Sequence, residues 1–171
     1  ELLKTDHRFK FVPATGFWIK EAKLYDKKKL VSMISSNKST CEGHRFRLSW
    51  VERLKDTVNL YGRGFKEIEN KEEGLCDYMF SVAIENGSYS SYFTEKILDC
   101  FAAGTVPIYH GSPDIGEYFN LEGIIQLDEH FSVEQLSEER YIRMLPAVKD
   151  NLERVKKMEI PEDWFYERYI K

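Results

Sequence analysis

The sequence predicts an α/β fold built on a parallel, doubly wound sheet, and two observations support this prediction. From Lys29 onward, short apolar runs of strand length alternate with amphipathic stretches of helix length, a pattern typical of parallel sheets with helical crossovers. The chain has 171 residues, of which 42% are hydrophobic, enough for one well-buried domain and too few for two large ones. We expect one domain over residues 29–171, preceded by a lead-in segment or linker over residues 1–28.

Five apolar runs are the predicted strands, at 30–34, 58–61, 78–84, 106–109 and 123–127. The carboxyl ends of parallel strands share one edge of the sheet, and ligands bind in the crevice at that edge. The turns after the first four strands should therefore line a ligand site. These turns contain Asn37, residues 62–64, residues 85–92 and residues 110–113.

Four stretches are predicted to be helical, the shortest of them around residues 115–119. Residues 44–55 place apolar side chains at helical spacing. A second helix is capped by Thr94 or Ser91 and should stop at Gly104. The tail, 133–169, is largely helical, and Pro161 should begin its last short helix. The charged stretch 66–73 is interpreted as a solvated loop.

Composition argues against several classes of protein. The net charge is -4 with both signs interspersed, so a nucleic-acid-binding surface is not indicated. No apolar run reaches the length of a membrane span. Three cysteines without a C-x-x-C argue against a disulfide framework or a structural zinc site, and favour a reducing compartment. A cytoplasmic location, free or peripheral to a membrane, is the expectation; a Golgi enzyme would carry its anchor upstream of this chain.

The segment 84–96, IENGSYSSYFTEK, combines a strand end, a polar loop and a helix start. Free N–H groups and the macrodipole at a helix start attract phosphate, and Lys96 adds a full positive charge there. Glu95 can accept hydrogen bonds from sugar hydroxyls, and Asn86 and Tyr92 supply further polar groups. This set suits a nucleoside diphosphate. An ordinary capped helix, with Lys96 in solvent, is the alternative interpretation.

The string from Phe80 to Asn120 closely resembles the signature of the alpha-1,3/1,4-fucosyltransferases, glycosyltransferase family 10. The matching residues are Glu85-Asn86, Tyr92, Thr94-Glu95-Lys96-Ile97, Pro107-Ile108-Tyr109, Gly111 and Pro113. Ile84 and Gly87 depart from the family pattern, which usually has Phe and Ser there. Upstream, Ser36-Asn37, Arg47 and Leu54 resemble the S-N…R-x6-L element of the family. Spacing to the leucine selects Arg47 as its arginine, and Arg45 is the alternative.

The resemblance implies a role for each matched residue. Arg47 and Lys96 would neutralise the donor diphosphate, Asn86 and Tyr92 would contact the nucleotide, and Glu95 would bind a ribose hydroxyl. It further implies a Rossmann-like domain that is the C-terminal half of a GT-B arrangement. The substrates would be GDP-fucose, or a similar GDP-sugar, and a glycan acceptor. The general base of the inverting reaction would lie in an N-terminal acceptor domain or a partner subunit, so this chain alone should bind nucleotide but transfer sugar poorly.

No Asp-x-Asp occurs, the pattern with which many glycosyltransferases hold a divalent metal. Fixed cations and a helix start can stabilise a leaving diphosphate instead, so we expect a metal-independent site with no cofactor. Asn37, Gly62, Gly64, Glu85 and His110 are further candidates for donor contacts. A tight turn is the preferred explanation of the two glycines, and a structural hydrogen bond is the preferred role of His110.

Three alternatives stay open at the level of the sequence. The tail, Pro161 to Tyr166, resembles endings of exostosin-like transferases, which would point to a UDP-sugar. The domain could also be a non-catalytic nucleotide- or glycan-binding module. Because the chain begins with Glu1, we expect a fragment of a full enzyme; a minimal protein that needs a partner or has lost activity is the competing explanation.

Overall fold

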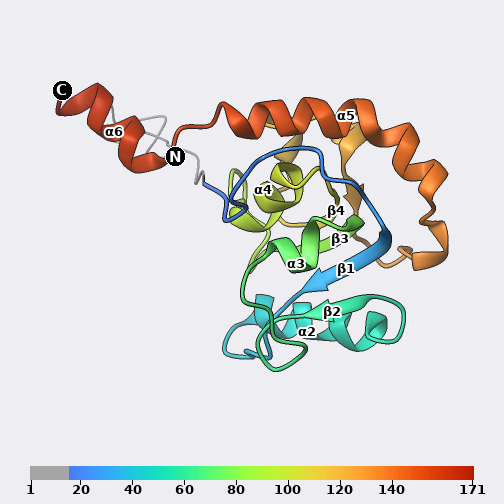
Figure 1. Cartoon of the computed structure of the whole chain (residues 1–171). Helices are drawn as coiled ribbons and strands as arrows, with labels where there is room; N and C mark the ends of the chain where they lie inside the picture. Colours follow the sequence, from blue (N-terminus) through green and yellow to red (C-terminus); the bar gives the residue numbers. More distant parts are fainter. Residues whose placement is uncertain (1–15) are drawn as a thin grey trace.

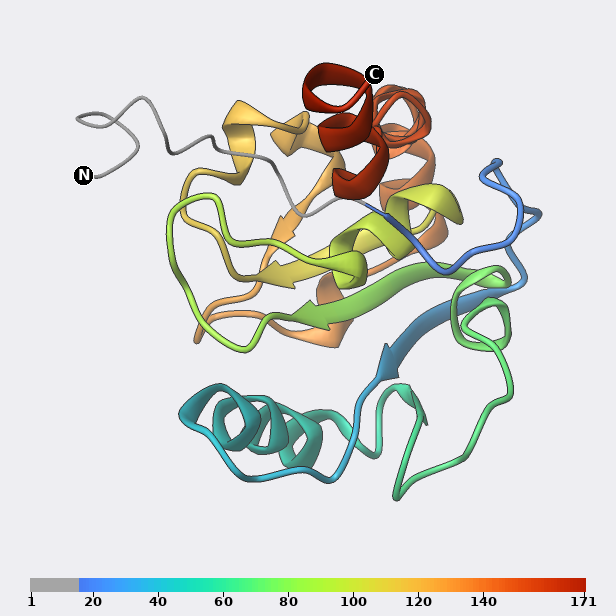
Figure 2. The same cartoon turned by 90° about the vertical axis from the view of Figure 1, so that its left-hand side faces the viewer.

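The computed structural model describes residues 16–171 and contains a five-stranded parallel sheet with helices on both faces (Figure 1). The strands are β1 (Lys29–Ile34), β2 (Asn59–Tyr61), β3 (Tyr78–Ile84), β4 (Val106–His110) and β5 (Ile125–Gln126). Their order across the sheet is β2-β1-β3-β4-β5, and every neighbouring pair is parallel. The predicted α/β class and doubly wound sheet are confirmed. Figure 2 shows the strands running in one direction, with the loops that follow them at the arrowhead edge.

The helices are α2 (Glu42–Leu54), α3 (Glu72–Leu75), α4 (Glu95–Ala102), α5 (Glu138–Lys156) and α6 (Pro161–Tyr169), with short 3-10 turns at Ile115–Glu117, Leu121–Gly123 and Val133–Gln135. Every residue of β3 is buried, because helices cover both faces of the central strand. On one face Phe80, Val82 and Ile84 pack with residues of α2 and α5. On the other face Ala83 packs with α3 and α4. Alternate side chains of one strand thus serve two hydrophobic cores.

Helix α4 begins and ends as the sequence predicts. Thr94, not Ser91, is the N-cap; its backbone is extended and its hydroxyl accepts from the Lys96 N–H. Gly104 follows the helix with a φ of +65°, a conformation that favours glycine. The helix packs Ile97, Leu98 and Phe101 into the core without exposure to solvent. Capping and burial together fix where the first turn of α4, with Glu95 and Lys96, meets the sheet edge.

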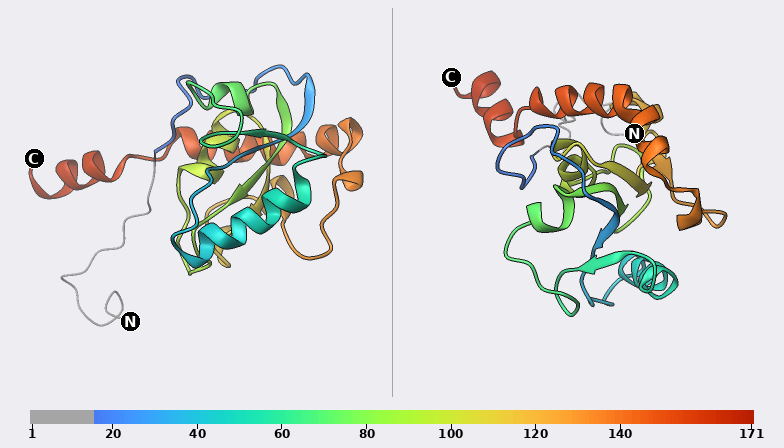
Figure 3. Two further views of the ribbon diagram at one scale, coloured as in Figure 1. Left: turned by 90° about the horizontal axis from the view of Figure 1, so that it is seen from below. Right: turned by 45° about the vertical axis from the view of Figure 1, so that its right-hand side comes forward.

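Two predictions of local structure need correction. The stretch 66–73 is not simply a solvated loop, because α3 begins at Glu72 and Lys71 makes two ion pairs. The fifth strand is two residues long where five were predicted. The start of α6 at Pro161 is confirmed. This last helix extends away from the body of the domain (Figures 1 and 3) and has no buried residue.

The second half of the lead-in segment packs on the domain, whereas residues 1–15 lie outside the described residues. Ile19 is buried among residues of α3 and α4. The Lys27 ammonium donates to the carbonyls of Cys76 and Ala103 at 3.0 and 2.7 Å, and burial lowers its pKa to about 8. The predicted domain boundary at residue 29 stays a prediction. Within the described chain, no helix is both long and apolar enough to cross a membrane.

Candidate functional site

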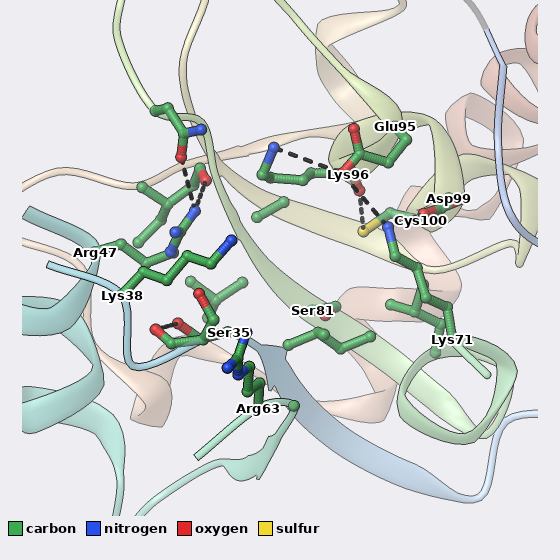
Figure 4. A pocket seen from close by; sticks show the side chains of 18 of the residues that line it. Ser35, Lys38, Arg47, Arg63, Lys71, Ser81, Glu95, Lys96, Asp99 and Cys100 are labelled. Carbon is green, nitrogen blue, oxygen red and sulfur yellow. Dashed lines mark hydrogen bonds and ion pairs between the residues drawn. The ribbon is translucent and has the colours of Figure 1, made fainter. Parts of the chain in front are cut away.

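A pocket of about 390 Å³ opens where β1 and β3 lie side by side. The chain passes from β1 to one side of the sheet and from β3 to the other, so the connections diverge and leave a crevice at this point. The loops after β1, β2 and β3, together with α2, α3 and α4, supply its lining. Figure 4 shows charged side chains entering this space from opposite sides. The predicted ligand crevice is therefore present.

One side, which we call the α2 wall, is formed by Lys38, Arg47 and Arg63. Arg47 is only 7% exposed; its Nη1 donates to Asn86 Oδ1 at 3.0 Å and lies 3.5 Å from the Ile84 carbonyl. Its buried Nε has no hydrogen-bond partner among the described residues. Burial lowers the pKa of this guanidinium. An anion at Arg47 would supply the charge and the acceptor that the wall lacks.

The facing side, the α4 wall, consists of Lys71, Glu95, Lys96 and Asp99. The Oε1 atom of Glu95 lies 3.6 Å from each of two ammonium groups, those of Lys71 and Lys96. Lys71 also contacts the buried Asp99 carboxylate at 2.5 Å. Burial acts to raise the pKa of Glu95, but the charges of Lys96 and Lys71 outweigh it and lower this pKa. The charges of the α4 wall are thus paired with one another before any ligand binds.

Glu85 supports the α4 wall from behind. Its side chain is fully buried, and it accepts from the Thr94 N–H at 2.9 Å, the Thr94 hydroxyl at 2.8 Å and the Lys96 ammonium at 3.0 Å. A buried carboxylate with three donors is a well-satisfied anchor. Glu85 therefore holds the N-cap of α4 and the Lys96 side chain in place, and it is not part of the pocket lining.

Residues 24–155 match the family described as glycosyltransferase family 10 (fucosyltransferase), C-terminal. The chain belongs to this family. Among its relatives is the alpha-(1,3)-fucosyltransferase FucT of Helicobacter pylori, 32% identical over 48% of this chain and 17% of that protein. The human GDP-fucose protein O-fucosyltransferase 3 is 28% identical over 70% of this chain and 20% of its own length.

Two solved structures of an alpha1,3-fucosyltransferase, one with GDP and one with GDP-fucose, share the fold. They superpose with TM-scores of 0.56 and 0.54 at 21% identity, over 78% and 77% of this chain and 49% and 47% of theirs. The described sheet and helices therefore share the fold of about half of each of these solved chains. The chain spans under half the length of these solved proteins and about a fifth or less of the two curated relatives named above.

The structure brings together Arg47, Asn86, Glu95 and Lys96, which all line the pocket. Of the two arginines, Arg45 is exposed, makes a long contact to the Ser39 carbonyl at 3.4 Å, and does not line the pocket. The donor-binding roles of these residues, which resemblance to the family-10 fucosyltransferases implies, remain predictions.

The remaining candidates lie at or beyond the margin of the pocket. Gly62 lines it, and a Cβ at this residue would meet the Ser35 carbonyl oxygen at 2.1 Å. Gly64 packs on the Asn37 side chain, where an added Cβ would lie 2.4 Å from Nδ2; both glycines have positive φ. Close approach and backbone conformation therefore explain the two glycines of this family-10 domain.

Tyr92 and His110 lie outside the pocket lining. The ring of Tyr92 packs edge-on against Tyr89, with centroids 6.0 Å apart. Burial raises the pKa of Tyr92, and the nearby charge of Glu85 raises it further. His110 lies against Phe46, with ring centroids 4.4 Å apart, in a separate hollow between α2 and the loop after β5. Burial lowers the pKa of His110. Within residues 16–171, neither side chain forms a hydrogen bond or ring contact with a residue of the α2 or α4 wall.

Five lysine, arginine, histidine or aspartate residues that line this family-10 pocket were not among the predicted site residues: Lys38, His44, Arg63, Lys71 and Asp99. Lys38 and Arg63 could have been predicted from the sequence, because both lie in turns that were expected to line the crevice. Glu95 and Asp99 are four residues apart on α4, so they share a helix face. Lys71 had no comparable signal, because only tertiary packing brings α3 beside α4. Across residues 16–171, no cluster of three or more His, Cys, Asp or Glu side chains could hold a metal ion.

Proposed function

We propose that this domain binds the GDP part of GDP-fucose and serves as the donor half of an inverting, metal-independent fucosyltransferase. The observation that carries the proposal is the charge of the α2 wall. Lys38 and Arg63 face the pocket without a side-chain hydrogen bond or ion pair to any described residue, and the buried Arg47 has an unsatisfied Nε. Three cations of this kind fit a diphosphate better than a neutral ligand.

Lys96 can make a fourth cationic contact to the diphosphate while it keeps its hydrogen bonds to Glu85 and Thr94. An ammonium group has three N–H donors, and two of them are directed at Glu85 and at the Thr94 hydroxyl, at 3.0 and 2.8 Å. The third remains for a phosphate oxygen or for Glu95. Asn86 and Tyr92 would contact the nucleotide, and Glu95 would accept from ribose hydroxyls.

In the proposed reaction, an acceptor hydroxyl attacks the anomeric carbon of fucose opposite the diphosphate, and the sugar–phosphate bond breaks. Negative charge grows on the GDP leaving group, and fixed cations stabilise it most when they are already in position. Arg47, Lys96 and the start of α4 supply this stabilisation, so we propose that no divalent metal is needed. The proton of the acceptor hydroxyl must pass to a base, which we place in an N-terminal acceptor domain or partner subunit.

A panel of nucleotides tests the proposal. Isothermal titration of the purified chain with GDP, UDP and CMP, with and without EDTA, should show binding selective for GDP that EDTA leaves unchanged. Selectivity for UDP would contradict the GDP-sugar assignment and favour the exostosin-like alternative. A folded protein that binds none of the three would contradict the donor site itself. Loss of GDP binding in EDTA would contradict metal independence.

All three cysteines are free in the structure, and this agrees with a reducing compartment. We therefore propose a cytoplasmic location for this part of the protein.

A further inference from the structure

The α4 wall contains a lysine that the proposed reaction does not use. Lys71 lies across from α4, its ammonium 2.5 Å from Asp99 Oδ2 and 3.6 Å from Glu95 Oε1. We infer that Lys71 is a positioning residue, anchored by Asp99, that shares Glu95 with Lys96 and so keeps this carboxylate available to bind ribose hydroxyls. The inference rests on the proposed function, since it assigns the ribose to Glu95.

Hydrogen bonds on both sides of Lys71 fix the backbone of the segment that carries it. Just before it, the N–H groups of Glu69 and Asn70 both donate to the Glu73 carboxylate, at 2.9 and 3.1 Å. After it, the Gly74 carbonyl accepts from the buried Ser32 hydroxyl of β1 at 2.6 Å. These contacts tie α3 to the sheet on one side of Lys71 and close the loop on the other. The backbone position of Lys71 therefore does not depend on the ion pairs of its side chain.

Asp99 is the anchor for the side chain. Its carboxylate is 1% exposed and accepts from two groups, the Trp18 N–H and the Lys71 ammonium, both at 2.5 Å. A buried carboxylate needs a full set of donors and a compensating charge. Asp99 therefore holds the Lys71 ammonium at one point, and that point is within reach of Glu95.

Glu95 is then shared between two cations at equal distances, 3.6 Å to Lys71 and 3.6 Å to Lys96. Without Lys71, the only ammonium within residues 16–171 that pairs with Glu95 is that of Lys96, and the carboxylate would close on it. That closure would remove Glu95 from the ribose and occupy the third N–H of Lys96. Lys71 therefore supports two contacts to the nucleotide while touching neither the ribose nor the diphosphate.

The experiment compares GDP with 2′,3′-dideoxyguanosine diphosphate, which lacks the ribose hydroxyls, by isothermal titration. The wild-type chain should prefer GDP by about tenfold, the range of a hydrogen bond to a charged group. Lys71→Met should reduce this preference to about threefold or less and weaken GDP itself about fivefold. Lys71→Arg should restore the preference, because it retains a cation within reach of both carboxylates.

Two further variants keep the result interpretable. Lys71→Gln can still donate to Asp99 but has no charge for Glu95, so it should lose the preference even if Lys71→Met does not fold. Lys66→Met removes a lysine of the same segment whose ammonium lies over the Tyr61 ring at 5.2 Å, outside the pocket, and should leave both affinities unchanged.

The outcomes separate the two proposals. A wild-type chain that does not bind GDP overturns the proposed function. A wild-type chain that binds GDP with the expected preference, while Lys71→Gln and folded Lys71→Met keep that preference, overturns the role of Lys71 alone. A double variant, Lys71→Met with Glu95→Gln, should show no loss of preference beyond that of Glu95→Gln, because Lys71 acts through Glu95.

Discussion

The two walls of the pocket use charge in opposite ways. On the α2 wall, Lys38 and Arg63 have no charged partner among the described residues, and Arg47 is held only by neutral acceptors. On the α4 wall, every charge is already paired: Lys96 with Glu85, and Lys71 with Asp99. The first arrangement attracts an anion, and the second fixes the positions of the groups that meet it. A binding site needs both. Electrostatic attraction contributes to affinity, and preorganised side chains reduce the conformational entropy that is lost on binding.

The difference has a structural origin. The cations of the α2 wall are Arg47 of α2 and two exposed side chains, Lys38 and Arg63, from the turns after β1 and β2. Those of the α4 wall lie beside two fully buried carboxylates, Glu85 and Asp99, which demand partners. The α4 wall should therefore contribute to folding, whereas the α2 wall should contribute mainly to binding. The predictions below test this division.

Removing the buried anchor should have the largest effect. Glu85→Ala leaves the Thr94 N–H and hydroxyl and the Lys96 ammonium without their shared acceptor. Breaking a buried pair in this way costs about 3 kcal/mol, which urea unfolding should measure. Glu52→Ala is the matched control, because Glu52 forms a surface ion pair with Lys55 at 73% exposure and should cost under about 0.5 kcal/mol. A loss below about 1 kcal/mol for Glu85→Ala would refute the anchoring role.

Arg47→Met should show the reverse pattern, a large loss of binding. The variant keeps an apolar stem in the buried site but removes the guanidinium, and GDP affinity should fall about 50-fold, as for the loss of a forked phosphate contact. Arg45→Met, two residues away and exposed, should change GDP affinity less than about twofold. Titration with GDP measures both. Equal effects of the two substitutions would show that Arg47 was not selected correctly.

These two residues also show how far the sequence leads. Local patterns sufficed for the strands β1 to β4, for α4 with its Thr94 cap, and for the polar turn after β3. Each depends on neighbours along the chain: apolar runs, a capping side chain and a stop glycine. The resemblance to the family favoured Arg47 over Arg45 because of its spacing to Leu54. Of these two arginines, Arg47 lines the pocket and Arg45 does not.

The sequence could not predict the charge pairs within the α4 wall. Lys71 and Asp99 are 28 residues apart and belong to different elements, so their contact depends on how α3 packs beside α4. A charged stretch such as 66–73 looks like a solvated loop unless its partners are known. Glu85 matched the family pattern, yet its burial behind the pocket, which makes it an anchor, follows from the packing of β3 against α4.

Smaller losses are expected for the two unpaired cations of the α2 wall. Lys38→Ala and Arg63→Ala should each weaken GDP binding about fivefold. The losses should add in the double variant, because the two side chains share no partner. Lys149→Ala, an exposed lysine of α5, should change nothing. Raising the salt concentration should reduce the difference between wild type and each variant, since exposed charges are screened. Losses that do not depend on salt would contradict a charge contact at the mouth of the pocket.

The smallest expected effect concerns His44, which lines the α2 side of the pocket and contacts the Thr40 hydroxyl at 3.0 Å. Partial burial lowers its pKa, and the charges of Arg47, Lys38 and Lys96 lower it further. A bound diphosphate would neutralise these three cations and raise the pKa of His44. The imidazole would then take up a proton when GDP binds. The contribution of His44 to GDP affinity should therefore increase as the pH falls below the usual pKa of histidine.

The phosphates of GDP titrate in the same pH range, so the wild type alone does not isolate this gain. The ratio of GDP affinities between wild type and His44→Asn removes the contribution of the ligand, because both proteins meet the same nucleotide. The ratio should be about three at pH 5.5 and near one at pH 8. His130→Asn, in an exposed loop at 86% side-chain exposure, should show a ratio near one at both pH values. A constant ratio for His44→Asn would show that the α2 wall attracts the diphosphate only through its lysine and arginine side chains.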